Sequence, residues 1–488
     1  MSGKLKSLKM NATMNLLKVV AGLVFPLITF PYTSRVLGPE GVGKINFATS
    51  FVGYFTLLAS IGVPLYGIRE VAKIRENRQE LASLIQELLV MHGVASGISL
   101  LLLLTIVILS PKIYAEWLLF FIVSASVPLS VLTMDWLYQG LEEYVYITIR
   151  SLTFTFLSVI SLFLFVHHPE DYWINAVITV MASLGSSVLN FWNARKLIFS
   201  QRSRPWNFRK HLKPLSMIYA LNFIISIYIN LDTVMLGFMS TAKNVGYYAS
   251  SMKLTKMLLA MVTSFGGVLL PRLAWYLAND KRYEFDRMLR KSLGIILFLC
   301  IPITASLILL GREIILVIAG SQYLEAVSCI NITAPIILFI GLTNIFGMQI
   351  LYPLGRERGV VVSVAFGALV SLILNFALIP TMAHLGAAWA TLAAESIVLI
   401  VQLFIIRKIY VIQWPWGSLF RILVGTVAMG LTIIFVHSLT DENQFLLRLL
   451  IDVPCGSLVY LLALYLMKEE FFRELLDVLK KRLAYGKI

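Results

Sequence analysis

The chain has 488 residues, of which 58% are hydrophobic and only 14% are charged, and its mean hydropathy is +0.83. These values exclude a soluble protein, because long apolar runs recur from end to end and each can cross about 30 Å of hydrocarbon. A β-barrel is also excluded, since the runs are continuous rather than alternating. The net charge of +15 lies mostly in short loops, so it indicates membrane topology rather than nucleic-acid binding.

The apolar runs predict an all-α polytopic membrane protein with about fourteen transmembrane helices. Short polar turns separate them throughout the chain. The expected spans are 12–36, 43–63, 82–109, 117–138, 148–166, 174–194, 214–238, 246–270, 292–316, 329–353, 360–380, 385–406, 419–438 and 445–467.

The basic residues are distributed very unequally between the two sides of the membrane. With the N-terminus inside, 32 of the 41 lysines and arginines fall in inner loops. The positive-inside rule therefore predicts that both termini are cytoplasmic. The expected outer connections are all short, which leaves no room for an external catalytic domain, so we expect no enzyme.

Two stretches about two hundred residues apart share the same pattern. Residues 26–70 and 230–273 are both hairpins, in which Leu37-Gly38 corresponds to Leu236-Gly237 and Val42-Gly43 to Val245-Gly246. Two parallel repeats are a known plan of membrane transporters. We therefore expect two related six-helix lobes with a central cavity between them, followed by a further helix pair.

This repeat predicts the organisation of the whole chain. The longest basic connection lies between the sixth and seventh spans, where the two halves meet, and the chain ends in a segment with apolar residues at helical spacing. The expected parts are an N-terminal lobe at 1–194, a basic cytoplasmic linker at 195–213, a C-terminal lobe at 214–406, two further spans at 407–467, and a cytoplasmic amphipathic tail at 468–488.

Five cations fall inside or at the ends of spans rather than in inner loops. A cation near the middle of a bilayer costs about 2.5–3.5 kcal/mol, so such residues usually face a wet cavity or a partner. If equivalent hairpins face each other, these cations meet in one lumen and favour an anionic substrate headgroup. The alternative is that these cations snorkel or form structural pairs. The five cations are Arg35, Lys253, Lys18, Lys44 and Lys256.

Four other cations are expected to snorkel to the outer boundary: Lys112, Lys243, Arg312 and Arg448. Among the acids within spans, Asp232 lies in the seventh span beside Asn222 and Asn230. These three residues are a candidate site for a coupling ion, H⁺ or Na⁺, and the alternative for Asp232 is a structural pair with a nearby lysine. The three cysteines lie in separate apolar segments without ligand spacing, so the sequence indicates no metal site and no cofactor.

Several motifs resemble one family. They are PYTSRVLGPEGVG (31–43), ASIGVPLYGIRE (59–70), DWLYQGLEEY (135–144), NLDTVMLGF (230–238), NVGYYASSMKL (244–254) and NFALIPTMAHLGAAWATLAAE (375–395). They are similar to the polysaccharide-exporting branch of the multidrug/oligosaccharidyl-lipid/polysaccharide exporter superfamily, and within it to the Wzx-type flippases of O-antigen and capsule repeat units.

The resemblance implies fourteen helices in two lobes, a cavity that opens alternately to each side, and a glycan on undecaprenyl diphosphate as substrate. It implies that the protein lies in the bacterial inner membrane and serves the synthesis of lipopolysaccharide O-antigen, capsule or exopolysaccharide. A downstream polymerase and a chain-length regulator are then candidate partners. Arg35 matches the position of a lumen cation through the SRVLG motif, and Lys253 through the segment after GYY.

The leading hypothesis is thus a flippase that moves lipid-linked oligosaccharide from the inner to the outer leaflet. Three alternatives stay open. A peptidoglycan lipid-precursor flippase and a cation-coupled multidrug exporter would belong to the same superfamily. A membrane glycan polymerase or glycosyltransferase would belong to another class, and the short outer loops argue against it because such enzymes need a sizeable loop with catalytic side chains.

Overall fold

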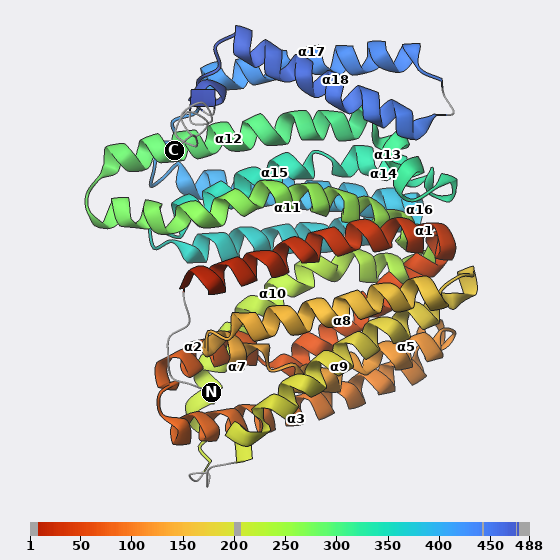
Figure 1. Ribbon diagram of the computed structural model, residues 1–488, viewed down its shortest axis with the longest axis vertical. Coiled ribbons are helices and arrows are strands. Elements are labelled where there is room, and N and C mark those ends of the chain that lie inside the picture. The colour runs from red at the N-terminus through yellow and green to blue at the C-terminus, as the bar shows by residue number, and fades with distance from the viewer. Residues whose placement is uncertain (1–7, 200–205, 442–443, 475, 478–488) are drawn as a thin grey trace, which may run out of the picture. The chain divides into compact units, whose positions relative to one another are not determined.

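The structure, a computed structural model, describes residues 8–199, 206–441, 444–474, 476 and 477. Across these residues every regular element is a helix (Figure 1), which confirms the all-α prediction. The chain forms two compact units, Met1–Gly246 and Tyr247–Ile488. We call them unit 1 and unit 2. The expected lobe division at 195–213 stays a prediction, because compactness alone does not report how the two halves of the sequence are related.

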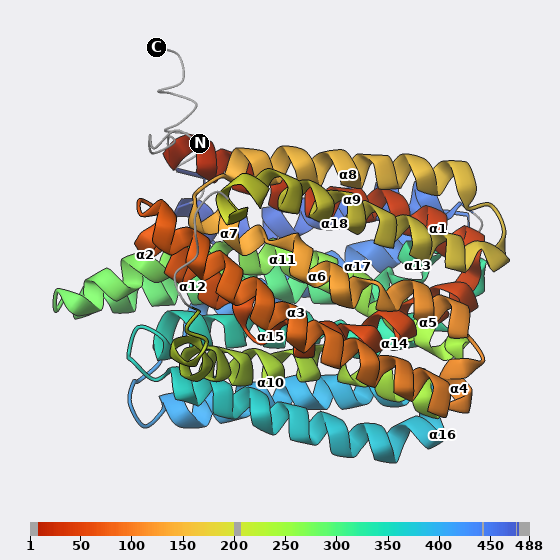
Figure 2. The same ribbon diagram turned by 90° about the horizontal axis from the view of Figure 1, so that it is seen from below.

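The described residues of unit 1 form four long helices, two helices of intermediate length and several short ones. In chain order they are α1 (Leu8–Ser60), α2 (Val63–Ile74), α3 (Arg78–Leu109), α4 (Pro111–Tyr114), α5 (Trp117–Ser124), α6 (Ser126–Thr133), α7 (Asp135–Gly140), α8 (Tyr144–Phe165), the 3₁₀ turn η1 (Pro169–Asp171), α9 (Tyr172–Phe199) and α10 (Arg209–Met239). Helices α1, α8 and α9 lie side by side in this unit (Figure 2).

Unit 2 begins within a helix, and its last two long helices, α17 and α18, are neighbours (Figure 1). Its elements are α11 (Ala242–Ala278), α12 (Arg282–Leu309), α13 (Gly311–Ile318), the 3₁₀ turn η2 (Ser321–Tyr323), α14 (Ala326–Thr333), α15 (Ile336–Asn344), the π-helical segment η3 (Ile345–Leu351), α16 (Glu357–Ile406), α17 (Trp416–Leu439) and α18 (Phe445–Leu466).

The number of membrane-crossing segments agrees with the prediction. Within the described residues, ten segments are long and apolar enough to cross a bilayer. Two of them, 65 and 50 residues long, each contain a kink and have the length of two crossings. Helices α10 and α11, with 31 and 37 residues, supply two more. About fourteen crossings result.

The first kink replaces the short turn expected between the first two spans. Helix α1 continues through this region except at Gly38, whose φ of 65° and ψ of 177° are not helical. This combination of dihedrals is open almost only to glycine. Pro39 follows at once, and its missing N–H and fixed φ suit the first turn of a new helix. Sequence and backbone therefore agree on a sharp bend at one residue.

Several predicted spans are interrupted in ways that the sequence did not indicate. The span expected at 117–138 is divided into α5, α6 and α7, with Met134 in a left-handed conformation at φ 43°. The span at 329–353 is divided at Pro335 and ends in π-helix. Proline and π-helical turns both break the regular ladder of helical hydrogen bonds. These membrane segments are thus bent, not straight.

Large apolar side chains cover much of the surface of both units. Leu101 and Ile108 of α3 are 68% and 69% exposed, and Leu431 of α17 is 63% exposed. Contiguous apolar surface of this kind is rare on soluble monomers. In a bilayer it contacts lipid chains, and the continuous helices satisfy the backbone hydrogen bonds that lipid cannot. The protein is a multi-pass membrane protein.

The kink at Gly38 yields a stability prediction. Replacing Gly38 with alanine should destabilise the folded protein by about 1–3 kcal/mol, because a Cβ strains the backbone at this φ and ψ. Thermal unfolding of the purified protein in detergent measures the effect. Gly22→Ala, in the same helix with open space around the site, is the matched control. Equal melting temperatures of the two variants would show that the backbone conformation at residue 38 does not require glycine.

Candidate functional site

Arg35, the leading site prediction, lies one turn before the kink of α1. Its neighbour Ser34 is fully buried, whereas the Arg35 side chain is exposed. The helix therefore turns its serine toward the packed interior of unit 1 and its guanidinium away from it. An arginine at this place can present its planar fork to a phosphate group.

The two stretches of the expected repeat meet within unit 1 through glycines. A Cβ on Gly43 of α1 would overlap the carbonyl oxygen of Ala242, and a Cβ on Gly246 would overlap the carbonyl oxygen of Pro39. The backbones approach each other so closely that no side chain fits between them. Val42-Gly43 and Val245-Gly246, paired in the sequence repeat, therefore lie against each other at the kinked end of α1.

A cluster of aromatic rings lies beside this glycine contact. Phe238 of α10 meets Phe47 and Phe51 of α1 edge-on, with ring centroids 5.2 and 5.5 Å apart. Phe120 of α5 meets the same two rings, at 5.5 and 6.1 Å. Edge-to-face pairs of this geometry stabilise a packed core. Helix α10 is thereby fixed against α1.

Lys112 lies in the same region, where it binds protein groups instead of snorkelling as expected. Its ammonium group donates to the carbonyl oxygens of Phe238 and Ser240, at 2.9 and 2.7 Å. These carbonyls belong to the C-terminal end of α10, where a cation is favourable both as a hydrogen-bond donor and for the helix dipole. Lys112 therefore caps α10.

The three residues of the candidate ion site all lie on α10. Asp232 is buried, at 6% exposure, and it lies within electrostatic range of Tyr54 on α1. The amide of Asn230 donates to the carbonyl of Ser226, at 3.3 Å. The side chain of Asn222 lies outside the described part of the structure. An ion site at Asp232 stays a prediction.

Lys18 belongs to a charged network that the sequence did not predict. Asp135, at the start of α7, lies 2.6 Å from Arg150 of α8 and 3.7 Å from Lys18 of α1, and it accepts a hydrogen bond of 3.0 Å from Asn190 of α9. Arg150, expected in an inner loop, has a side chain only 4% exposed. One carboxylate thus holds two cations from two helices, which favours a structural role for Lys18.

Lys44 is also paired within unit 1. Its ammonium group lies 2.8 Å from Glu116 and 3.3 Å from Glu40. Tyr172 donates its hydroxyl to the other oxygen of Glu116, at 2.7 Å, and places its ring 4.8 Å from the Lys44 nitrogen. Two carboxylates and an aromatic face compensate this one cation. The geometry favours the structural alternative for Lys44.

Lys253 and Lys256 lie in unit 2, on one face of α11. The opposite face carries Ser251 and Thr255, which bond to Ala326 and Thr333 of α14 at 3.0 and 3.3 Å. Lys253 is half-buried and Lys256 is exposed. Residues three apart on a helix share a side, so the two ammonium groups form one cationic stripe. Their convergence with the cations of unit 1 stays a prediction.

A second buried network, which the sequence did not predict, joins the basic connection before α10 to α3 within unit 1. Glu87 of α3 lies 2.8 Å from Lys210 and from Nε2 of His211, and it accepts a bond of 2.7 Å from the backbone N–H of Asn207. The other ring nitrogen of His211 lies 2.7 Å from the hydroxyl of Tyr66. The available signal was an acid in an apolar run, followed by a basic linker that contains a histidine.

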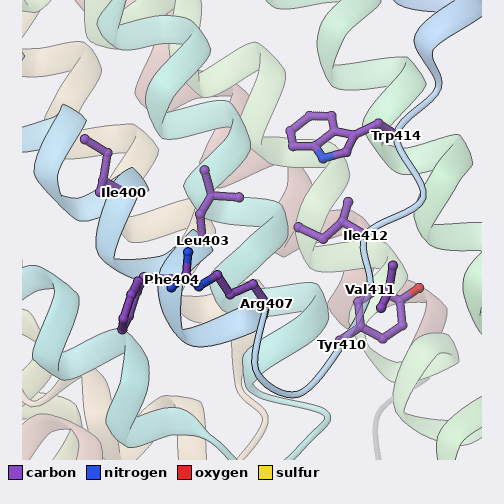
Figure 3. Close-up of a pocket in the computed structure, with 8 residues that line it drawn as sticks. All are labelled: Ile400, Leu403, Phe404, Arg407, Tyr410, Val411, Ile412 and Trp414. Carbon is purple, nitrogen blue, oxygen red and sulfur yellow. The ribbon is translucent and has the colours of Figure 1, made fainter.

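A pocket of about 450 Å³ lies in unit 2 where α16 leads into α17. Figure 3 shows Arg407, Tyr410 and Trp414 among its walls. The guanidinium of Arg407 lies 4.2 Å from the ring of Phe404, and Tyr410 donates to Asp286 at 2.6 Å. Burial raises the pKa of the Tyr410 phenol, and the Asp286 carboxylate raises it further. None of the predicted site residues lines this pocket.

The bent helices, the lipid-facing surface and the internal charge networks define a multi-pass helical membrane protein. The chain belongs to the family described as polysaccharide biosynthesis protein, whose model matches residues 8–276. This match confirms the resemblance drawn from the motifs.

Relatives of known name agree with the family. The chain is 24% identical over 406 residues to an Escherichia coli (strain K12) protein named "Putative O-antigen transporter", with 80% of this chain and 95% of that protein covered. It is 22% identical over 233 residues to a Haloferax volcanii protein named "Probable low-salt glycan biosynthesis flippase Agl15", with 47% and 48% covered.

A solved structure shares the fold. The lipid II flippase MurJ in an inward closed conformation superposes with a TM-score of 0.71, covering 96% of this chain and 99% of that one. The sequence identity is 17%, so this likeness concerns the fold alone.

The glycine contact predicts a strong steric effect. Gly43→Ala should destabilise unit 1 by about 1–3 kcal/mol, since the neighbouring atoms are backbone and cannot move aside as a side chain would. The melting temperature of the purified protein is the measurement. Gly53→Ala, ten residues along the same helix with nothing within 4 Å of its new Cβ, is the control. Unchanged stability in both variants would contradict the close approach.

The Asp135 network predicts a dependence between charges. Asp135→Asn should destabilise the protein by about 2–3 kcal/mol, because it leaves the buried Arg150 guanidinium uncompensated. Adding Arg150→Gln to this variant should restore part of the loss, which a double-mutant cycle by thermal unfolding detects. The exposed Asp280→Asn is the control. Strictly additive effects of the two substitutions would show that the pair is not coupled.

Proposed function

We propose that this protein is a lipid-linked oligosaccharide flippase. It moves a glycan on undecaprenyl diphosphate from the inner to the outer leaflet by alternating access, for O-antigen, capsule or exopolysaccharide synthesis. The observation that carries the proposal is the family match over residues 8–276, together with relatives named as an O-antigen transporter and a glycan flippase.

The substrate's diphosphate determines what the protein must supply. Moving a diphosphate through a region of low dielectric is costly unless cations neutralise it. Arg35 is the first residue proposed for this task, because its side chain is exposed and offers two parallel donors to phosphate. Lys253 and Lys256 are proposed as a second contact in unit 2. Lys18 and Lys44 contribute less, since carboxylates already compensate them.

The proposal includes an energy source and an orientation. A coupling ion, H⁺ or Na⁺, would bind at Asp232 with the help of Asn230 and Asn222. Both termini would be cytoplasmic, as the distribution of basic residues predicts. The protein would lie in a bacterial inner membrane, where a polymerase and a chain-length regulator would use the exported glycan.

The alternatives differ from this proposal in their ligands. A peptidoglycan precursor also carries a diphosphate, so it would use the same cations but a different glycan. A multidrug exporter would instead bind organic cations, which Arg35 and the α11 lysines repel. A glycan polymerase would need a catalytic centre in an outer loop, and the connections between the spans are short.

Native mass spectrometry of the gently purified protein tests the proposal. The wild-type protein should carry a polyprenyl-diphosphate glycan, and Arg35→Ala should retain about tenfold less of it, the loss expected for one charge-assisted contact. Arg312→Ala removes another exposed arginine, on α13, and should bind like wild type. The mass of the bound glycan also separates a repeat unit from a peptidoglycan precursor.

Two results would contradict the proposal. Binding of organic cations without any glycolipid would indicate a multidrug exporter. Equal loss of glycolipid in Arg35→Ala and Arg312→Ala would remove Arg35 from the site, although the flippase function would stand.

A further inference from the structure

The connection between α16 and α17 borders two cavities of unit 2. The first is the pocket of about 450 Å³ that contains Arg407, and the second is an apolar groove of about 500 Å³ between α12, α15 and α17. Trp414 lines both of them, so the pocket and the groove adjoin at this side chain. Figure 3 shows Arg407 and Trp414 at separate places in the wall of the pocket.

Two cations at the pocket lie on one aromatic ring. The guanidinium of Arg407 lies 4.2 Å and the ammonium of Lys408 lies 4.6 Å from the ring centroid of Phe404. Along the described ranges of the chain, neither cation forms an ion pair with a carboxylate. Asp286 instead accepts the hydroxyl of Tyr410. Because a guanidinium stacked on a ring keeps N–H groups at its edge, the pocket offers donors and positive charge to an anion.

The groove, in contrast, offers only an apolar surface. Its walls include Leu297 and Ile308 of α12 and Leu423 of α17. The hydroxyl of Thr304, also in the wall, already donates to the carbonyl of Ala334 at 3.4 Å. The part of α12 between Leu297 and Ile308 rises by about 16 Å, which is about half of the hydrocarbon thickness of a bilayer. The groove therefore has the length of an acyl chain in one leaflet.

The predicted orientation places this connection at the cytoplasmic boundary of the membrane. Arg407 and Lys408 fall in an expected inner loop, and Trp416, at the start of α17, is 68% exposed. Tryptophans gather between headgroups and hydrocarbon, and anionic lipids attract basic side chains at this depth. A soluble anion would leave the groove unused, and an apolar molecule would leave Arg407 uncompensated. The occupant that fits both parts has an anionic head and an apolar chain.

We propose that the pocket at Arg407 and the apolar groove bind one anionic phospholipid of the inner leaflet. Its phosphodiester accepts hydrogen bonds from Arg407, with Lys408 beside it, and one acyl chain passes Trp414 into the groove. The chain contacts α12, α15 and α17 together, so the lipid stabilises the packing of α17 within unit 2. This lipid is a bound component and is not transported. The inference holds whether or not the proposed flippase function is correct.

Quenching of tryptophan fluorescence by brominated lipids tests the site in the full-length protein. The chain has nine tryptophans, and the difference between wild type and Trp414→Phe isolates the signal of Trp414. In vesicles of phosphatidylcholine, phosphatidylglycerol with brominated chains should quench Trp414 at an about tenfold lower mole fraction than brominated phosphatidylcholine. This preference is expected for one charge-assisted contact with a headgroup of net negative charge.

Two substitutions separate the headgroup contact from the groove, each measured with and without Trp414→Phe. Arg407→Gln should abolish the preference for phosphatidylglycerol, and its exposed position makes a folding defect unlikely to interfere. Ala305→Phe fills the groove and should lower quenching by both lipids. The matched control is Arg195→Gln, which removes an arginine stacked on Trp192 in unit 1, and it should leave the quenching of Trp414 unchanged.

Four results would overturn the proposal. They are equal quenching by the two lipids, an undiminished preference in Arg407→Gln, undiminished quenching in Ala305→Phe, and relief of the quenching by unbrominated polyprenyl diphosphate. The last result would assign the groove to the lipid proposed as substrate. Failure of the flippase proposal in native mass spectrometry would leave these measurements unaffected, so the two proposals can fail separately.

Discussion

A charge inside the hydrocarbon region must be paired, hydrogen-bonded or in contact with water, because the lipid offers no compensation. This requirement explains most of the polar architecture of the protein. In unit 1, Asp135 pairs with Arg150, and Glu87 binds His211. In unit 2, Glu313 and Asp452 surround His437 and Arg448. Each network joins helices that are far apart in sequence, so the same pairs that make burial of charge tolerable also fix which helices are neighbours.

The second constraint is steric and acts where α1 bends. Gly38 provides a backbone conformation that other residues avoid, and Gly43 allows the backbone of α1 to touch that of α11. The aromatic rings of Phe47 and Phe238 pack beside this contact. A bend and a close approach within six residues give a rigid corner. Arg35 lies one turn away from this corner, so its position along α1 is well determined even though its side chain is exposed.

The sequence predicts the spans well and their interruptions poorly. Apolar runs reveal that a segment crosses the membrane, whatever its partners are. Gly38-Pro39 indicates a bend, because glycine permits backbone conformations that other residues avoid and proline lacks the N–H of a helical hydrogen bond. Met134, in contrast, adopts a left-handed conformation that its residue type does not favour, so the surrounding fold must impose it. Local sequence contains no signal for such a break.

Charged residues show the same limit more sharply. The sequence identifies Glu87, Asp135 and Asp452 as acids in apolar runs, but their partners lie up to 124 positions away. Arg448 was expected to snorkel, and this was wrong: it is 3% exposed and bound to His437 and Thr440. A cation near a helix end can reach water or a buried acid, and only the arrangement of the neighbouring helices decides between the two.

The cations that are paired with carboxylates differ from the exposed cations in how readily they can bind a phosphate. A cation held by a carboxylate, such as Lys44 with Glu116, can bind a phosphate only by giving up its partner, and part of the gain is lost. The side chains of Arg35 and Lys256 are exposed, whereas Lys18 and Lys44 lie 3.7 and 2.8 Å from the carboxylates of Asp135 and Glu116. Accessibility to a ligand therefore favours Arg35 and Lys256 among the predicted cations.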